Sequence, residues 1–207
     1  MSLKTSNLPF KARVDHEVHN TIMRKAVVKA QETIGANRQK MVDELGHWEE
    51  WRDLSKQIRN HVLANLDAYL YQLSEKVIEN GGKVYFAETA EEASAYIRKV
   101  ALEKNAKKIV KSKSMVTEEI GLNEVLEKEG MQVIETDLGE YLLQISGDKP
   151  SHIVVPAIHK DRHQIRKDLS EKLGYEGEET PEDMTRFVRE KIRQDFLEAD
   201  IGISGCN

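Results

Sequence analysis

Residues 1–80 carry apolar side chains at helical spacing. A stripe that recurs every three or four positions is typical of a helix with one apolar face. We expect one helical unit over residues 14–45, with a break or bend near Gly35, and a second helix over residues 48–79. The sequence Asn-Gly-Gly at 80–82 predicts the end of that helix, because glycine accepts the left-handed backbone of a helix C-terminus. The first 80 residues are therefore expected to form a helical arm.

The pattern changes after residue 82, where short apolar runs alternate with helices that begin at capping residues. Such alternation predicts an α/β domain with a mostly parallel, doubly wound sheet. The expected strands are residues 83–87, 108–111, 131–135 and 152–155, and the expected helices are residues 89–104, 117–129, 138–145, 161–173 and 180–199.

A fifth strand is expected to begin within residues 200–207. Parallel strands are normally buried on both faces, so a sheet that stops at the first residues of a strand is unfinished. We therefore expect an α/β domain over residues 81–207 that is incomplete at its C-terminal end. A frayed C-terminal tail is the alternative interpretation.

Composition and charge narrow the function classes. The chain has 207 residues and a net charge of −5, and its lysines and arginines form no basic stripe of the kind that nucleic-acid binding requires. Its one cysteine, Cys206, has no partner within the chain for a disulfide. No segment approaches the roughly 20 apolar residues that span a bilayer, and the N-terminus lacks a signal-peptide core, so we expect a cytoplasmic location.

The first candidate site is the loop after the second expected strand, which contains Lys111, Ser112, Lys113 and Ser114. In an open α/β sheet, ligands bind at the carboxyl ends of strands. Two ammonium groups, two hydroxyl groups and the start of a helix suit a phosphate or a carboxylate. The alternative is a polar loop in which a serine or threonine caps the helix.

A second candidate site follows the third expected strand, where Glu135, Asp137 and Glu140 lie within six residues. Such carboxylates can supply an acid/base pair or a metal ligand. The simpler interpretation is that Asp137 caps the next helix and the other acids stabilise its start.

A third candidate site contains His159, Arg162 and His163. Histidines four residues apart share one face of a helix, as zinc ligands do. This argument fails if Asp161 caps the helix, because His159 then lies outside it. The neighbouring arginines would also repel a dication, so the residues fit an anionic substrate better, and we expect no metal site.

Several segments together resemble the lactate utilization protein B family. They are Asn-Gly-Gly-Lys-Val-Tyr-Phe-Ala at 80–87, Ile-Val-Lys-Ser-Lys-Ser-Met-Val-Thr-Glu-Glu-Ile-Gly-Leu-Asn at 109–123, Glu-Thr-Asp-Leu-Gly-Glu-Tyr at 135–141, Pro-Ser-His-Ile-Val-Val-Pro-Ala at 150–157, His-Lys-Asp-Arg-His at 159–163 and Ala-Asp-Ile-Gly-Ile-Ser-Gly at 199–205. The resemblance implies a component of a three-part cytoplasmic system that oxidises L-lactate to pyruvate and relays electrons. It also implies an N-terminal lactate-utilization (LUD) α/β domain, similar in fold to sugar isomerases and CoA transferases, and a C-terminal ferredoxin-like domain with two [4Fe-4S] clusters.

The chain departs from that family pattern because it lacks the cysteines that would hold a cluster. We therefore expect the N-terminal part of such an iron–sulfur protein, with no cofactor of its own, that docks to other subunits of the lactate utilization system or binds a small anionic ligand. We also include a homo-oligomer among the assemblies that such a chain could form. One alternative is a small-molecule enzyme of the isomerase or CoA-transferase type, acting on an anionic substrate. Another is a pure interaction module built from the N-terminal helices.

Overall fold

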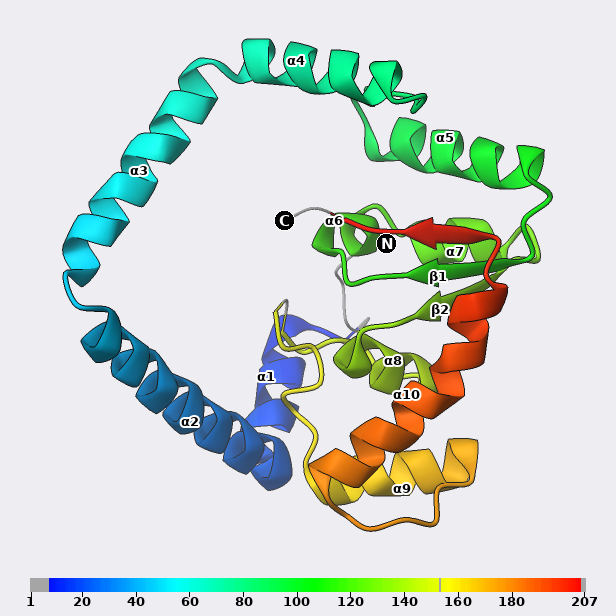
Figure 1. Cartoon of the computed structure of the whole chain (residues 1–207). Coiled ribbons are helices and arrows are strands. Elements are labelled where there is room, and N and C mark those ends of the chain that lie inside the picture. Colours follow the sequence, from blue (N-terminus) through cyan, green and yellow to red (C-terminus); the bar gives the residue numbers. More distant parts are fainter. Residues whose placement is uncertain (1–7, 153, 206–207) are drawn as a thin grey trace. The chain divides into compact units, whose positions relative to one another are not determined.

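The computed structural model describes residues 8–152 and 154–205 (Figure 1). These residues belong to two compact units, one formed by residues 31–87 and the other by the described residues within 1–30 and 88–207. Among the described residues, no helix is both long enough and apolar enough to cross a membrane.

The described part of the first 80 residues is mainly helical, as predicted, but the helix breaks differ from the prediction. The helices are α1 (Phe10–His19), α2 (Thr21–Leu45), α3 (Trp48–Ala64) and α4 (Leu66–Glu79). Gly35 does not break the helix, because α2 continues through this residue; a single glycine costs a helix only about 1 kcal/mol.

Asparagines mark two of the observed breaks. Asn20 separates α1 from α2, and its side-chain oxygen accepts a hydrogen bond from the backbone N–H of Met23 at 3.0 Å. Asn65 divides the predicted helix 48–79 into α3 and α4. Asparagine side chains compete with the helix for backbone hydrogen bonds, which explains breaks at these positions.

The predicted strand at residues 83–87 is wrong, because these residues have no regular secondary structure. Tyr85 and Phe86 are exposed there. The run has the aromatic and β-branched residues typical of a strand, but strand propensity depends on a neighbouring strand and a buried face.

The sheet has three parallel strands in the described residues, β1 (Lys108–Lys111), β2 (Gln132–Glu135) and β3 (Ile201–Ile203). Their order is β2-β1-β3. This arrangement confirms the α/β class and the predicted strands at 108–111 and 131–135. It also confirms a strand within residues 200–207, of which 206 and 207 lie outside the described residues.

The predicted strand at residues 152–155 is wrong for the residues that the structure describes there, which form bends, and Ile153 lies outside them. The ring nitrogen Nδ1 of His152 accepts hydrogen bonds from the backbone N–H groups of Val154 at 3.1 Å and Val155 at 3.0 Å. Because a local side chain satisfies these N–H groups, they are not available for a strand ladder.

Helices cover both faces of the sheet, as a doubly wound arrangement requires (Figure 1). Successive residues of a strand point to opposite faces. Val110 and Ile134 accordingly pack with residues of α8 (Leu138–Ser146), α9 (Arg162–Leu173) and α10 (Pro181–Glu198). Their neighbours Ile109 and Val133 pack on the other face with residues of α5 (Ala90–Glu103) and α7 (Leu122–Glu127).

The helix starts in this unit follow the capping chemistry read from the sequence. The side chains of Thr89, Ser114, Asp137, Asp161 and Thr180 each accept a hydrogen bond from a backbone N–H in the first turn of the helix that follows. The single helix predicted over 117–129 is instead two short helices, α6 (Met115–Glu119) and α7. Gly121, with φ of 64°, separates them in a left-handed conformation that suits glycine.

Candidate functional site

The last residues of β1 and β2, Lys111 and Glu135, meet at the carboxyl end of the sheet. The parallel register pairs the two residues, so their side chains lie on the same face. The ammonium Nζ of Lys111 is 2.7 Å from Oε1 of Glu135. Lys111 is 0% exposed and Glu135 is 3% exposed, so the pair lies inside the protein.

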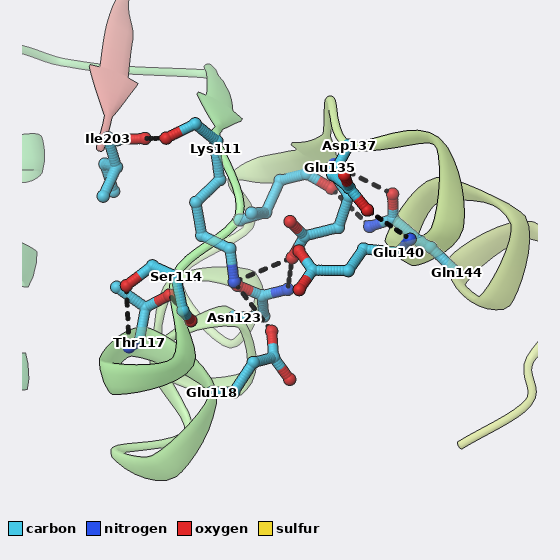
Figure 2. Close-up of polar contacts among 12 residues, drawn as sticks. Lys111, Ser114, Thr117, Glu118, Asn123, Glu135, Asp137, Glu140, Gln144 and Ile203 are labelled. Atoms are coloured by element: carbon cyan, nitrogen blue, oxygen red, sulfur yellow. Dashed lines mark hydrogen bonds and ion pairs between the residues drawn. The ribbon is translucent and has the colours of Figure 1, made fainter. Parts of the chain in front are cut away.

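Three further side chains complete this charged cluster, which consists of Lys111, Glu118, Asn123, Glu135 and Glu140 (Figure 2). Oε1 of Glu118 and Oδ1 of Asn123 each accept a hydrogen bond from Lys111 at 2.9 Å. The amide nitrogen of Asn123 donates to Oε1 of Glu135 at 2.7 Å. Asn123 therefore connects the two charges of the buried pair.

Local helix caps position the acids of the charged cluster. Ser114 begins α6 by accepting a hydrogen bond from the N–H of Thr117 at 3.2 Å, and Glu118 follows on the same helix. Asp137 begins α8 by accepting a hydrogen bond from the N–H of Glu140 at 3.2 Å. Glu118 and Glu140 thus approach the ends of the strands from two different helices.

Burial and charge change the pKa values of the cluster. Burial alone would lower the pKa of Lys111, but the hydrogen bond and charge of Glu135, followed by those of Glu118, raise it overall. Burial raises the pKa of Glu140 from 4.5 to about 7, with contributions from the charge of Glu135 and a hydrogen bond with it. At neutral pH, Glu140 therefore exchanges readily between its acid and its carboxylate forms.

The charged cluster has the groups for two kinds of chemistry. Carboxylate oxygens of Glu118, Glu135 and Glu140 lie within 4.8 Å of one another, a spacing that a divalent cation could bridge. A carboxyl group that titrates near neutral pH can also donate or accept a proton. Lys111 already provides a positive charge beside two of these carboxylates, which favours the second role over the first.

The residues of the first predicted site fill several different roles. Oγ of Ser112 is 3.1 Å from Oγ of Ser204, the residue after β3, and the ammonium of Lys113 donates to the backbone carbonyl of Val154. Ser114 is buried and caps α6, which confirms the capping interpretation for this residue. Anion binding by this loop stays a prediction.

The second predicted site separates into two parts. Asp137 caps α8, as its simpler interpretation proposed. Glu135 and Glu140 belong to the charged cluster.

The residues of the third predicted site point to different partners. Asp161 and Gln164 form a reciprocal capping box, so His159 lies before α9 and the shared-face argument does not apply. Nδ1 of His159 is 2.8 Å from Oγ of Ser151, whereas Nδ1 of His163 is 3.2 Å from Oε2 of Glu179. Arg162, the first residue of α9, is exposed.

Sequence reasoning missed Glu118 and Asn123 as site residues and gave Glu140 only a stabilising role at the start of a helix. One signal for Glu118 was available, since it occupies the first turn of a helix that follows a strand end. No motif pointed to Asn123, whose role depends on α7 packing against the sheet.

The family model of the LUD domain matches residues 70–207. The chain belongs to the LUD domain family. This match includes all three strands and every residue of the charged cluster.

Related proteins extend the similarity to all 207 residues. The chain is 71% identical to "Uncharacterized electron transport protein YkgF" of Escherichia coli K12, over 100% of the chain and 44% of that protein. It is 56% identical to "Lactate utilization protein B" of Bacillus cytotoxicus, covering 44% of it, and 54% identical to the protein of the same name in Oceanobacillus iheyensis, covering 43%. These findings confirm the resemblance seen in the sequence, and the chain spans less than half the length of these relatives. No solved structure matches the chain significantly.

Proposed function

We propose that this chain acts in L-lactate utilization as the LUD-domain part of an electron-transfer protein of the cytoplasm. The observation that supports this proposal is the high identity over the whole chain to relatives whose names specify lactate utilization and electron transport. The oxidation of L-lactate to pyruvate releases electrons that a carrier must accept. The contribution of these 207 residues would be to bind a ligand or to dock to another subunit of the system.

The chain has too few cysteines to hold the iron–sulfur clusters that would carry the electrons. A [4Fe-4S] cluster is held by four cysteine thiolates, whereas the sequence has one cysteine, Cys206. The two clusters implied by the family resemblance would therefore need ligands from sequence beyond these 207 residues, and we assign no step of electron transfer to residues of this chain.

A genetic experiment tests the proposed role. The segment that encodes these residues would be deleted in frame from the native strain, after removal of any other L-lactate dehydrogenase. We expect growth on L-lactate as the carbon source to be lost, growth on glucose to be unchanged, and both to be normal after restoration of the segment. Undiminished growth and oxygen uptake on L-lactate would contradict the proposal.

A second candidate function is that of a small-molecule enzyme acting on an anionic substrate. The charged cluster favours it, because a lysine and three glutamates at the carboxyl ends of parallel strands can perform acid/base chemistry. Thermal-shift measurements on the folded chain with lactate, pyruvate, sugar phosphates and CoA esters test this function. A stabilising ligand whose effect disappears in Glu135→Gln would support it, and no shift with any of these compounds would remove it.

A further inference from the structure

Two oxygen atoms in the charged cluster lack a donor among the described residues. They are Oε2 of Glu135 and Oε2 of Glu140, and both are buried. An unsatisfied buried polar atom costs about 1–3 kcal/mol, and more when it is charged. Because Glu135 is 3% exposed, bulk solvent has little access to its carboxylate.

The other oxygen of Glu135 is fully engaged. Oε1 accepts from the ammonium of Lys111 at 2.7 Å and from the amide of Asn123 at 2.7 Å. These contacts fix the position of the carboxylate. Figure 2 shows Glu140 reaching from α8 toward Glu135, on the side away from the helix that carries Glu118.

Counting charges shows what the cluster lacks. Three glutamates facing one another contribute three negative charges when all are ionised, and Lys111, the cation that faces them, contributes one positive charge. The remaining excess of two negative charges is unfavourable in a partly buried place. One proton bound to Glu140 halves this excess and supplies a donor for the unsatisfied oxygen of Glu135.

We propose that Glu140 and Glu135 share one proton, and that this carboxyl pair is a proton-transfer site at the carboxyl ends of β1 and β2. Glu140 holds the proton and donates it in a hydrogen bond to Glu135, whose negative charge Lys111 stabilises. The side chain of Glu118 is 32% exposed, so the cluster is open to solvent on that side and a proton can be exchanged there. Nothing in this assignment depends on the role in lactate utilization.

Infrared difference spectroscopy on the intact 207-residue chain tests the assignment. The wild-type protein is expected to show the carbonyl stretch of a buried protonated carboxyl group at pH 6, and this band is expected to disappear with a midpoint near pH 7. In Glu140→Gln the band should be absent at every pH. In the control Glu119→Gln, which changes an exposed acid on α6, the band and its midpoint should be unchanged.

Two results would overturn the proposal. One is that no protonated carboxyl band is seen in the wild type at pH 6 or above, or that such a band is still present in Glu140→Gln. The other is binding of one equivalent of Mn²⁺ at pH 6, measured by calorimetry and lost in Glu140→Gln, because the unsatisfied oxygens would then be ligands of a cation. Because Glu140→Gln keeps the size of the side chain, circular dichroism of the variant is expected to match the wild type, and a Glu140→Asp variant that retains the band at a shifted midpoint would further support the pair.

Discussion

At the scale of single residues, the charged cluster of the LUD domain is organised around Lys111, a lysine whose side chain is fully buried. Lys111 is 0% exposed, and its ammonium is surrounded by the oxygens of Glu118, Asn123 and Glu135. A buried ion pair adds little net stability, but removing one partner leaves the other charge unpaired. The cluster is therefore sensitive to substitutions that change its charge and tolerant of those that preserve it.

Replacing Lys111 with Met tests this sensitivity. Methionine fills similar space without the charge, so Glu135 is left buried without its cation, and we expect the free energy of unfolding to fall by about 3–5 kcal/mol. Urea denaturation measures the change. Lys104→Met, at an exposed position, should change it by less than about 0.5 kcal/mol, and the double variant Lys111→Met, Glu135→Gln should recover part of the loss. A cost that is equal in both lysine variants would contradict the account.

The pKa of Glu140 predicts how stability changes with pH. Its value is about 7 in the folded protein against 4.5 as the ordinary value, so the folded state binds the proton more tightly than the unfolded chain. The stabilisation is complete below pH 4.5 and is lost as the pH rises through 7. Since Glu140 is partly accessible to solvent, we expect a loss of about 1–2 kcal/mol from this group between pH 5 and pH 8.

Chemical denaturation across that pH range measures the effect. The Glu140→Gln variant mimics the protonated acid and should have a flatter stability profile than the wild type, whereas Glu119→Gln should keep the wild-type profile. Equal slopes for Glu140→Gln and the wild type would show that Glu140 does not titrate in this range.

At the scale of elements, the edge strand β3 is held to β1 by contacts at both of its ends. The carboxylate of Asp200, just before β3, accepts hydrogen bonds from the backbone N–H groups of Lys107 at 2.7 Å and Lys108 at 3.0 Å. After β3, Gly205 passes close to Ser114, the residue that caps α6. The path of the chain after β3 and the position of the start of α6 therefore depend on each other.

Adding a methyl group at Gly205 tests this link. A Cβ there would lie 2.0 Å from Oγ and 2.4 Å from Cβ of the buried Ser114, so one of the two segments must move. We expect Gly205→Ala to destabilise the domain by about 1–3 kcal/mol, as overpacking does. Gly202→Ala is the control, because its Cβ would meet nothing within 4 Å. Thermal unfolding of the two variants measures the difference, and a Gly205→Ala variant as stable as Gly202→Ala would contradict the close approach.

At the scale of the whole molecule, the described strands and helices form an α/β unit whose polar cluster lies where ligands bind in this class of fold. Two hydrophobic clusters on opposite faces of the sheet fix the strands, and the loops at their carboxyl ends carry the charged residues. The helices of residues 31–87 form a second compact unit. The family match covers the α/β unit from α5 onward and begins within α4.

Local chemistry made much of this fold predictable. The caps at Thr89, Asp137 and Thr180 located helix starts, because a side chain and its own backbone decide them. Strands at 108–111 and 131–135 were recognisable because buried parallel strands are short apolar runs. The same signal failed at 83–87, which has no partner strand among the described residues. It also failed at 152–155, where the side chain of His152 accepts the hydrogen bonds of the backbone N–H groups.

The candidate site was predictable only in part. Lys111 and Glu135 were identified because each directly ends a strand, but their pairing depends on which strands are neighbours. Lys111 was expected to face an anionic ligand, and the structure shows that carboxylates of the protein surround it. Contacts between residues from five separate elements arise from packing, and no local spacing encodes them.

The most direct test of the account joins its two halves, the charged cluster and the proposed role in L-lactate utilization. In the deletion strain, L-lactate-dependent oxygen uptake would be measured after restoration with the wild-type segment, with Glu140→Gln or with Glu119→Gln, at equal protein levels. We expect Glu140→Gln to lower the rate at least ~10-fold, as the loss of a proton-transfer group does, and Glu119→Gln to leave it unchanged. A wild-type rate with Glu140→Gln would contradict the claim that the charged cluster is the functional site of this domain.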